Sequence, residues 1–172
     1  MNSSPSTATM PDACSALSYP ALIRLIAEID DNGPIPLRRL AGTLADLSEY
    51  RLRRATDLAR DLGLVHVRPG GRLGLTTSGS ELADLYDATA RWARRHAYPS
   101  AASDFTHRIQ STLALLLAAA PALTEEHGLC APTADSQLTA DAHADLTGAR
   151  DLLDQWLAAN QAAQPGAPQS AE

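Results

Sequence analysis

Three arginines, Arg51, Arg53 and Arg54, fall within four consecutive positions of the chain. A guanidinium group is always charged, and its planar set of donors matches the oxygens of a phosphate or the N7 and O6 atoms of guanine. The residue types and their spacing therefore suit the recognition of phosphates or base edges. The alternative interpretation is an ordinary solvated charged surface on a core helix.

The residues around these arginines carry the signals of one short amphipathic helix. Ser48 suits the N-cap position because its hydroxyl can accept a hydrogen bond from the first helical turn. Gly63 suits the position just beyond the end of a helix. Apolar residues recur between them at helical spacing: Leu52, Ala55, Leu58, Ala59 and Leu62. The sequence predicts a helix over 48–62, with the arginines near its start and off the apolar stripe.

Two further helices are expected before this one. Apolar residues over 17–31 predict a buried helix that ends at Asn32-Gly33-Pro34. Pro36 suits the first turn of a second helix over 36–44, with four side chains directed inward: Leu37, Leu40, Ala41 and Leu44. Helix, short helix, tight turn and helix form the helix-turn-helix arrangement.

A β-hairpin is expected directly after the third helix. Residues 64–68 alternate and are rich in β-formers, Pro69-Gly70-Gly71 forms a turn, and residues 72–76 return. Arg68 and Arg72 flank the tip, where they can reach phosphates or the minor groove, or stay merely solvated. Three helices followed by a hairpin are typical of a winged helix-turn-helix, in which the hairpin is the wing.

The rest of the chain is predicted to be helical. Helices are expected over 77–97, capped by a residue of 76–78, over 103–120 and over 138–161. The fold class is mainly α with a small β-hairpin wing: a winged helix-turn-helix plus a C-terminal helical dimerisation region. The expected organisation is a disordered tail over 1–15, a DNA-binding domain over 16–97, a helical region over 98–162 and a disordered tail over 163–172.

Charge is distributed unevenly along the chain. The formal net charge is −6, yet residues 36–72 hold eight arginines against four acidic residues, a net charge of +4. This asymmetry suits a contact with DNA on one face of an otherwise acidic protein. The acidic residues within the same segment keep a protein-binding role open: Asp46, Glu49, Asp57 and Asp61.

The sequence offers little for catalysis or for metal binding. It has no phosphate-binding loop, GxSxG or HExxH motif and no convincingly spaced pair of carboxylates, so no enzymatic activity and no cofactor are expected. Glu126, His127 and Cys130 can in principle bind a metal, but an ordinary loop is the preferred interpretation. The N-terminus lacks the pattern of a signal peptide and no apolar run has membrane-spanning length, which predicts a cytoplasmic protein.

From Cys14 to His96 the chain resembles winged helix-turn-helix transcriptional regulators, most closely the HxlR group within the MarR-like class. The resemblance rests on the segments NGPIPLRRLAGTL, LSEYRLRRATDLARDLGLV, GRLGLTTSGSEL and RWARRH. The chain departs from the HxlR pattern at Tyr19-Pro20, where a Trp-containing segment is usual, and in its short hairpin. It also continues for about 75 residues after His96, similar to the terminal helices of MarR- and PadR-type regulators.

The resemblance implies a homodimer, paired through its C-terminal helices, that binds a pseudo-palindromic DNA site, with a repressor as the favoured role. Surplus apolar surface in 113–120 and in the last helix is an independent hint of dimerisation. The residues of the third helix expected to contact DNA are Ser48, Tyr50, Arg51, Arg53 and Arg54. Salt-dependent contacts with the phosphate backbone of the DNA are expected from Arg38, Arg39, Arg68 and Arg72.

The sequence also leaves open two candidate regulatory sites and two alternative functions. Cys14 matches a position that senses oxidants in several HxlR-like regulators, although nearby Asp12 disfavours a reactive thiolate. A pocket between the helices of the dimer, lined by Trp92, Phe105 and Trp156, can bind an apolar small-molecule effector, but plain core residues are the preferred interpretation. The alternative functions are a winged-helix module that binds protein rather than specific DNA, and a segment like those found ahead of small-molecule methyltransferase domains. The second is disfavoured because no catalytic domain follows.

Overall fold

The computed structural model describes residues 15–118 and 138–162, and these are mostly helical with one small three-stranded antiparallel sheet. The elements in chain order are α2 (Pro20–Asn32), β1 (Ile35–Pro36), the 3-10 helix η1 (Leu37–Arg39), α3 (Leu40–Thr43), α4 (Glu49–Asp61), β2 (Val65–Arg68), β3 (Arg72–Leu75), α5 (Thr77–Arg95), α6 (Phe105–Ala118), α7 (Ala140–Asp145) and α8 (Thr147–Ala162). The expected tails over 1–15 and 163–172 lie, apart from Ser15, outside the described residues.

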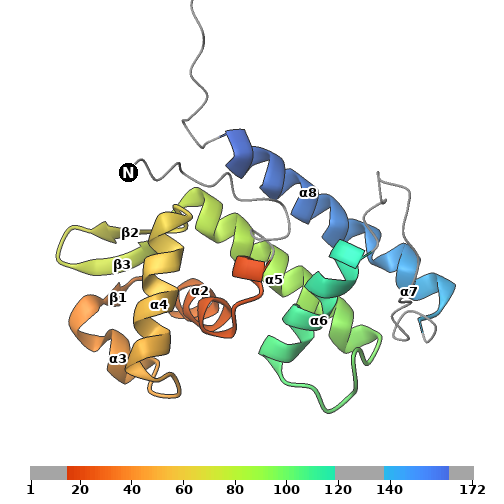
Figure 1. Ribbon diagram of the computed structural model, residues 1–172, viewed down its shortest axis with the longest axis horizontal. Coiled ribbons are helices and arrows are strands. Elements are labelled where there is room, and N and C mark those ends of the chain that lie inside the picture. Colours follow the sequence, from red (N-terminus) through yellow and green to blue (C-terminus); the bar gives the residue numbers. More distant parts are fainter. Residues whose placement is uncertain (1–14, 119–137, 163–172) are drawn as a thin grey trace, which may run out of the picture.

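Helix α5 is the element against which most others pack. It contacts α2, α6 and α8 along its length and β3 at its start. The sheet, α3 and α4 lie at one end of the molecule, and α6 and α7 lie at the other (Figure 1). Helix α8 runs alongside α5 between the two ends (Figure 1). Every helix and strand named above, except η1, contributes residues to one continuous hydrophobic core.

Helix α4 has the boundaries and the buried stripe that the sequence predicts. The Ser48 hydroxyl oxygen accepts a hydrogen bond from the backbone N–H of Arg51 at 3.4 Å. Gly63 follows the helix at a φ of +67°, a backbone conformation that glycine adopts without strain. Leu52, Ala55 and Ala59 are buried. The exposed side of the helix therefore starts at a fixed place, with its arginines in the first two turns.

The predicted hairpin is confirmed, but the sheet has a third strand that the sequence pattern did not indicate. Ile35 pairs with Leu73 and Pro36 pairs with Arg72, which makes the strand order β1-β3-β2. The prediction that a helix begins at Pro36 is wrong, because this pairing keeps residues 35–36 extended. The second helix is reduced to η1 and the single turn of α3. Of the four side chains expected to point inward, Leu40 and Leu44 are buried, whereas Leu37 and Ala41 are exposed.

The hairpin leads into α5 through a close backbone contact. Thr76 is the N-cap of α5; its hydroxyl donates to the Gly63 carbonyl at 2.7 Å and accepts from the Gly79 N–H at 3.1 Å. Gly79 lies directly against the carbonyl oxygen of Leu64, which leaves no space for a Cβ atom. The start of α5 is thus fixed against the junction between α4 and β2.

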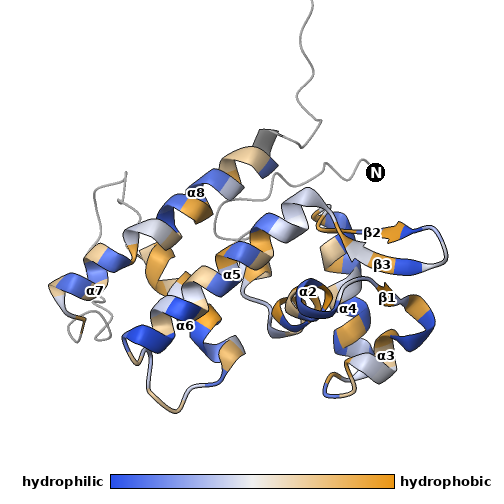
Figure 2. Cartoon of the chain, turned by 180° about the vertical axis from the view of Figure 1, so that it is seen from behind, coloured by the Kyte–Doolittle hydropathy of each residue, from blue (hydrophilic) through white to orange (hydrophobic). Residues whose placement is uncertain are grey.

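The C-terminal helices cover α5 within a single chain. Apolar and polar residues alternate along α8 at helical spacing (Figure 2), and its Leu153, Trp156 and Leu157 are buried. The Trp156 Nε1–H donates to the Ser78 carbonyl at 2.9 Å. Four apolar residues of α6 are buried as well: Ile109, Leu113, Leu115 and Leu116. Within residues 113–118 and 147–160, much of the expected surplus of apolar surface is thus covered by the same chain, and Leu152 is the one large apolar side chain of these ranges that is exposed.

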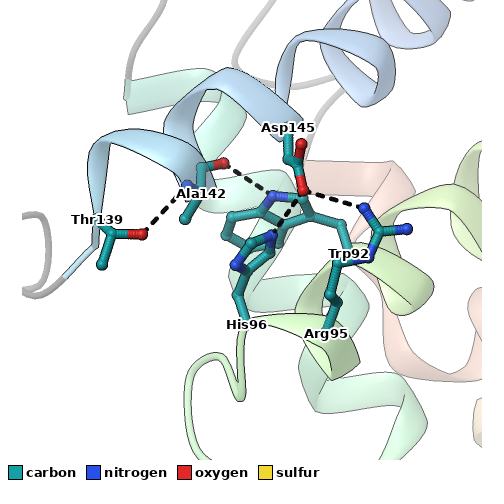
Figure 3. A network of polar contacts seen from close by, with 6 residues as sticks. All are labelled: Trp92, Arg95, His96, Thr139, Ala142 and Asp145. Carbon is teal, nitrogen blue, oxygen red and sulfur yellow. Dashed lines mark hydrogen bonds and ion pairs between the residues drawn. The ribbon is translucent and has the colours of Figure 1, made fainter.

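The predicted last helix is divided into α7 and α8 at Leu146, and α7 packs on the end of α5 (Figure 3). The Trp92 Nε1–H donates to the Ala142 carbonyl at 3.0 Å. Asp145 accepts from Arg95 at 3.0 Å and lies 3.2 Å from His96 Nε2. The Arg95 guanidinium, followed by the His96 ring, holds the pKa of Asp145 below its ordinary value.

None of the helices in the described ranges combines the length and the apolar character that crossing a membrane requires.

Candidate nucleic-acid interface

The start of α4 carries the three arginines, and all three side chains are exposed. Arg53 forms an i,i+4 ion pair with Glu49, with Nη2 and Oε1 separated by 2.9 Å, and both side chains are at least 70% exposed. A solvated pair of this kind contributes little to stability, so Arg53 can exchange it for another anion. The Arg51 side chain makes no hydrogen bond or ion pair to any residue in the described ranges. Two of the three guanidinium groups are thus available to a partner at little cost.

The exposed side of α4 changes in charge along its length. Tyr50, which is 71% exposed, and the arginines occupy the first two turns. Asp57 and Asp61 lie on the same exposed side but later in the helix, by about 6 Å or more beyond Arg53 at the usual helical rise. The positive end of the helix dipole reinforces the basic half. An anionic partner is therefore attracted to the N-terminal half of α4 and repelled from the C-terminal half.

Arg54 differs from its neighbours because its guanidinium lies over an aromatic ring. Its Cζ atom lies 5.2 Å from the centre of the Tyr19 ring, in the segment that precedes α2. Beside this contact, an open groove of about 650 Å³ separates the first described residues from α4. The groove is lined by Ser15, Ala16, Tyr19, Tyr50, Arg53, Arg54, Asp57, Leu58 and Asp61. The proximity of Tyr19 to Arg54 could not be read from the sequence, because 35 positions separate them.

The two hairpin arginines lie on the outer face of the sheet but are held differently. Arg68 lies across Gly74 on the neighbouring strand, and its Nε atom is 2.6 Å from the point that a Cβ of Gly74 would occupy. Arg72 instead donates from Nε at 3.0 Å and from Nη2 at 2.7 Å to the carbonyl oxygen of Pro34. These two hydrogen bonds tie the hairpin to the residue before β1, and no local pattern in the sequence indicates them.

The remaining expected contact residues lie on η1 and at the cap of α4. Arg38 and Arg39 are exposed on η1, and neither has a hydrogen bond or ion pair within the described part of the chain. Ser48 is exposed, but its hydroxyl is engaged in capping α4. All nine expected residues thus belong to η1, to α4 with its cap, or to the hairpin, and these segments share one end of the molecule (Figure 1).

The three aromatic residues expected to line one effector pocket lie in different surroundings. Trp92 donates to Ala142 near the C-terminal end of α5. Trp156 donates to Ser78 at the other end of α5, about 21 Å away at the helical rise. Phe105 borders a separate groove of about 600 Å³ together with Arg24 and Asp46. Within one chain, the two tryptophans are buried at opposite ends of α5, and neither lines the groove that Phe105 borders.

The structure does not describe Cys14, the possible redox sensor, or the loop group Glu126, His127 and Cys130. Within the described ranges, no three His, Cys, Asp or Glu side chains come together in a group that could hold a metal ion.

Comparison of the chain with models of known protein families, with curated proteins and with solved structures found no match.

Proposed function

We propose that this protein is a sequence-specific DNA-binding regulator of transcription, acting as a homodimer and as a repressor. The observation that carries the proposal is the exposed basic start of α4: Arg51, Arg53 and Arg54 stand there beside Tyr50. In this place they can enter a major groove, where guanidinium groups read guanine or bind phosphates.

The arrangement of the neighbouring elements supports an interpretation as a winged helix-turn-helix. The order is α2, β1, α3, α4, β2 and β3, with β1 paired to the hairpin. Helix α3 is short and precedes α4 by a tight connection, as in a helix-turn-helix. In this interpretation α4 is the recognition helix and the hairpin is a wing beside it. Arg68, at the hairpin tip, is then positioned to reach the DNA backbone.

The described contacts suggest different roles for the arginines. Arg51 and Arg53 are assigned to bases or phosphates because no strong bond holds them elsewhere. Arg38 and Arg39 are assigned to salt-dependent phosphate contacts. Arg72 donates two of its N–H groups to the Pro34 carbonyl, so its first role is to hold the hairpin in place. Any contact of Arg72 with DNA must use its remaining N–H donors.

The test is binding to DNA from the protein's own promoter region and to a scrambled duplex, over a series of salt concentrations. The variant Arg51→Ala/Arg53→Ala should lose at least about tenfold in affinity for the promoter DNA, since each good base contact contributes roughly 1–3 kcal/mol. The matched control is Arg91→Ala/Arg94→Ala, which removes the same charge from the exposed side of α5. Equal losses in both variants would reduce the interaction to overall charge and contradict a reading helix.

The homodimer is proposed from the resemblance to MarR- and PadR-type regulators. The described surface adds only Leu152 of α8, which is 38% exposed. Analytical ultracentrifugation over a range of concentrations measures the mass directly. A dimer should protect two half-sites about 34 Å apart in a footprint, whereas a monomeric protein that protects a single half-site would contradict this part of the proposal.

A protein-binding module remains the second candidate because two observations favour it. The net charge of the chain is −6, and Asp57 and Asp61 lie on the same exposed side of α4 as Arg54. Equal affinity for the promoter and the scrambled DNA, or no binding at low salt, would favour this candidate. The search for partners would then start from the groove beside α4.

A further inference from the structure

The geometry points to Tyr19 as a positioning residue that holds the Arg54 guanidinium ready for its DNA contact; this inference rests on the proposed function. Tyr19 lies outside the helix-turn-helix, in the segment before α2, and needs no contact with DNA itself. It acts through Arg54.

The contact between the two side chains has the geometry of a cation–π interaction. The Arg54 Cζ atom lies 5.2 Å from the Tyr19 ring centre, inside the limit of about 6 Å for such contacts. A solvated arginine samples many rotamers, and fixing it on binding costs conformational entropy. A side chain already stacked on a ring has met part of that cost in the unbound protein, which favours binding.

Tyr19 can position the Arg54 side chain because its own backbone is firmly held. The Tyr19 carbonyl accepts from the N–H groups of Leu22 at 3.0 Å and Ile23 at 3.1 Å, and Pro20 opens the helix behind it. The two preceding residues are tied to other helices. The Leu17 carbonyl accepts from the buried Tyr86 hydroxyl of α5 at 2.7 Å, and the Ser18 carbonyl accepts from Gln110 Nε2 of α6 at 2.8 Å.

These bonds link the placement of the ring to α5 and α6. Burial raises the pKa of Tyr86 well above its ordinary value, so its hydroxyl stays protonated and remains a donor at neutral pH. A displacement of α6 that broke the Gln110 bond would loosen the segment under the Tyr19 ring. The recognition helix is thereby connected to the C-terminal half of the molecule through three residues.

The stacking leaves Arg54 able to bind an anion. A cation–π contact uses the positive charge of the guanidinium and engages none of its N–H donors in a conventional hydrogen bond. In the part of the chain that the structure describes, no hydrogen bond or ion pair occupies those donors. Asp57 and Asp61 line the same groove but form no ion pair with Arg54. The contact therefore orients Arg54 without neutralising it.

The experiment is a double-mutant cycle measured by affinity for the promoter DNA. Tyr19→Phe keeps the ring and should bind like the wild type. Tyr19→Leu keeps apolar bulk without the ring and should lose about twofold to fivefold in affinity, the range of an exposed cation–π contact. In an Arg54→Ala background the Tyr19→Leu change should have no further effect. Equal losses in both backgrounds, or tighter binding by Tyr19→Leu, would overturn the inference.

A measurement on the unbound protein separates this inference from the proposed function. Stacking shifts the NMR signals of the Arg54 Hδ protons upfield by the ring current, and this shift should persist in Tyr19→Phe and vanish in Tyr19→Leu. Its absence from the wild type would overturn the inference, whatever the DNA result. Specific binding by the wild type with unchanged affinity in Tyr19→Leu would overturn this inference alone. A wild type without specific binding would overturn both.

Discussion

Gly79 allows α5 to start directly against the end of α4. A Cβ atom at this position would collide with the carbonyl oxygen of Leu64, which belongs to the backbone and cannot swing aside. We expect Gly79→Ala to lower the free energy of unfolding by about 3 kcal/mol, at the upper end of the usual cost of overpacking. Urea unfolding followed by circular dichroism measures the change.

The matched control for that substitution is Gly148→Ala in the first turn of α8. No heavy atom stands within 4 Å of a Cβ built at Gly148, so the same change should be neutral or stabilise the protein by up to about 1 kcal/mol. A similar loss of stability in both variants would show that the collision at Leu64 is not the cause.

Asp145 makes the packing of α7 on α5 sensitive to acid. Its pKa is lowered in the folded protein by Arg95 and His96. A carboxyl group with a depressed folded pKa contributes stability above its unfolded value and loses that contribution as the pH falls through the folded value. The stabilisation by Asp145 should therefore be complete at neutral pH and disappear progressively below its ordinary pKa of 3.8.

Asp145→Asn should accordingly be less stable than the wild type at neutral pH, and the two proteins should converge as the solution is acidified below pH 3.8. Thermal unfolding as a function of pH measures the difference. Asp154→Asn is the control, because this exposed carboxylate of α8 makes no ion pair within the described residues. A gap that stayed constant with pH would show that Asp145 contributes by packing rather than by its charge.

At the scale of elements, β1 depends on its partner strand and on Arg72. Two residues are too few to form a strand alone, and one of them is a proline. We expect Arg72→Ala to cost about 1 kcal/mol of stability, because it removes two charged hydrogen bonds to the Pro34 carbonyl at an exposed site. Arg39→Ala, an exposed arginine with no bond among the described residues, should change stability little. Urea unfolding compares the two variants, and equal effects would contradict this role of Arg72.

How well the sequence predicts a structural feature depends on how far apart along the chain the interacting residues lie. The cap at Ser48, the glycine at Gly63 and the hairpin are set by neighbours in the chain, and all three were predicted correctly. The short strand β1 exists because Ile35 pairs with Leu73, a residue 38 positions later. No local pattern distinguishes such an extended pair from the first turn of a helix that starts with proline.

The candidate site likewise combines features that local spacing predicts with contacts that the sequence does not reveal. The exposure of the α4 arginines follows from helical spacing and was predictable from the sequence. The Tyr19–Arg54 contact and the bond from Arg72 to Pro34 depend on how the chain returns on itself, so the sequence did not reveal them. The burial of Trp92 and Trp156 agrees with the preferred interpretation of these residues as core, but their separation by the length of α5 was not evident from the sequence.

At the scale of the whole molecule, α5 joins the two ends into one core. Helices α2, α6 and α8 all pack on it, so the described parts should unfold together. The two tryptophans report on opposite ends of α5: Trp92 through α7 and Trp156 through the start of the helix. We expect the single-tryptophan variants Trp92→Phe and Trp156→Phe each to give a fluorescence midpoint in urea that coincides with the midpoint by circular dichroism of the same variant. A fluorescence transition that precedes the circular dichroism transition would show that α7 and α8 form a separate unit.

The strand order β1-β3-β2 places β2 at the outside of the sheet, and no other described strand pairs with its outward backbone groups. An unpaired edge can template the addition of a strand from another molecule, the first step of aggregation. Here the edge strand is only four residues long, carries His66 and Arg68 on its outer face and is followed directly by Pro69. Charge, brevity and proline are the devices that discourage such addition. The features that keep the hairpin short and basic thus also discourage aggregation through the edge of β2.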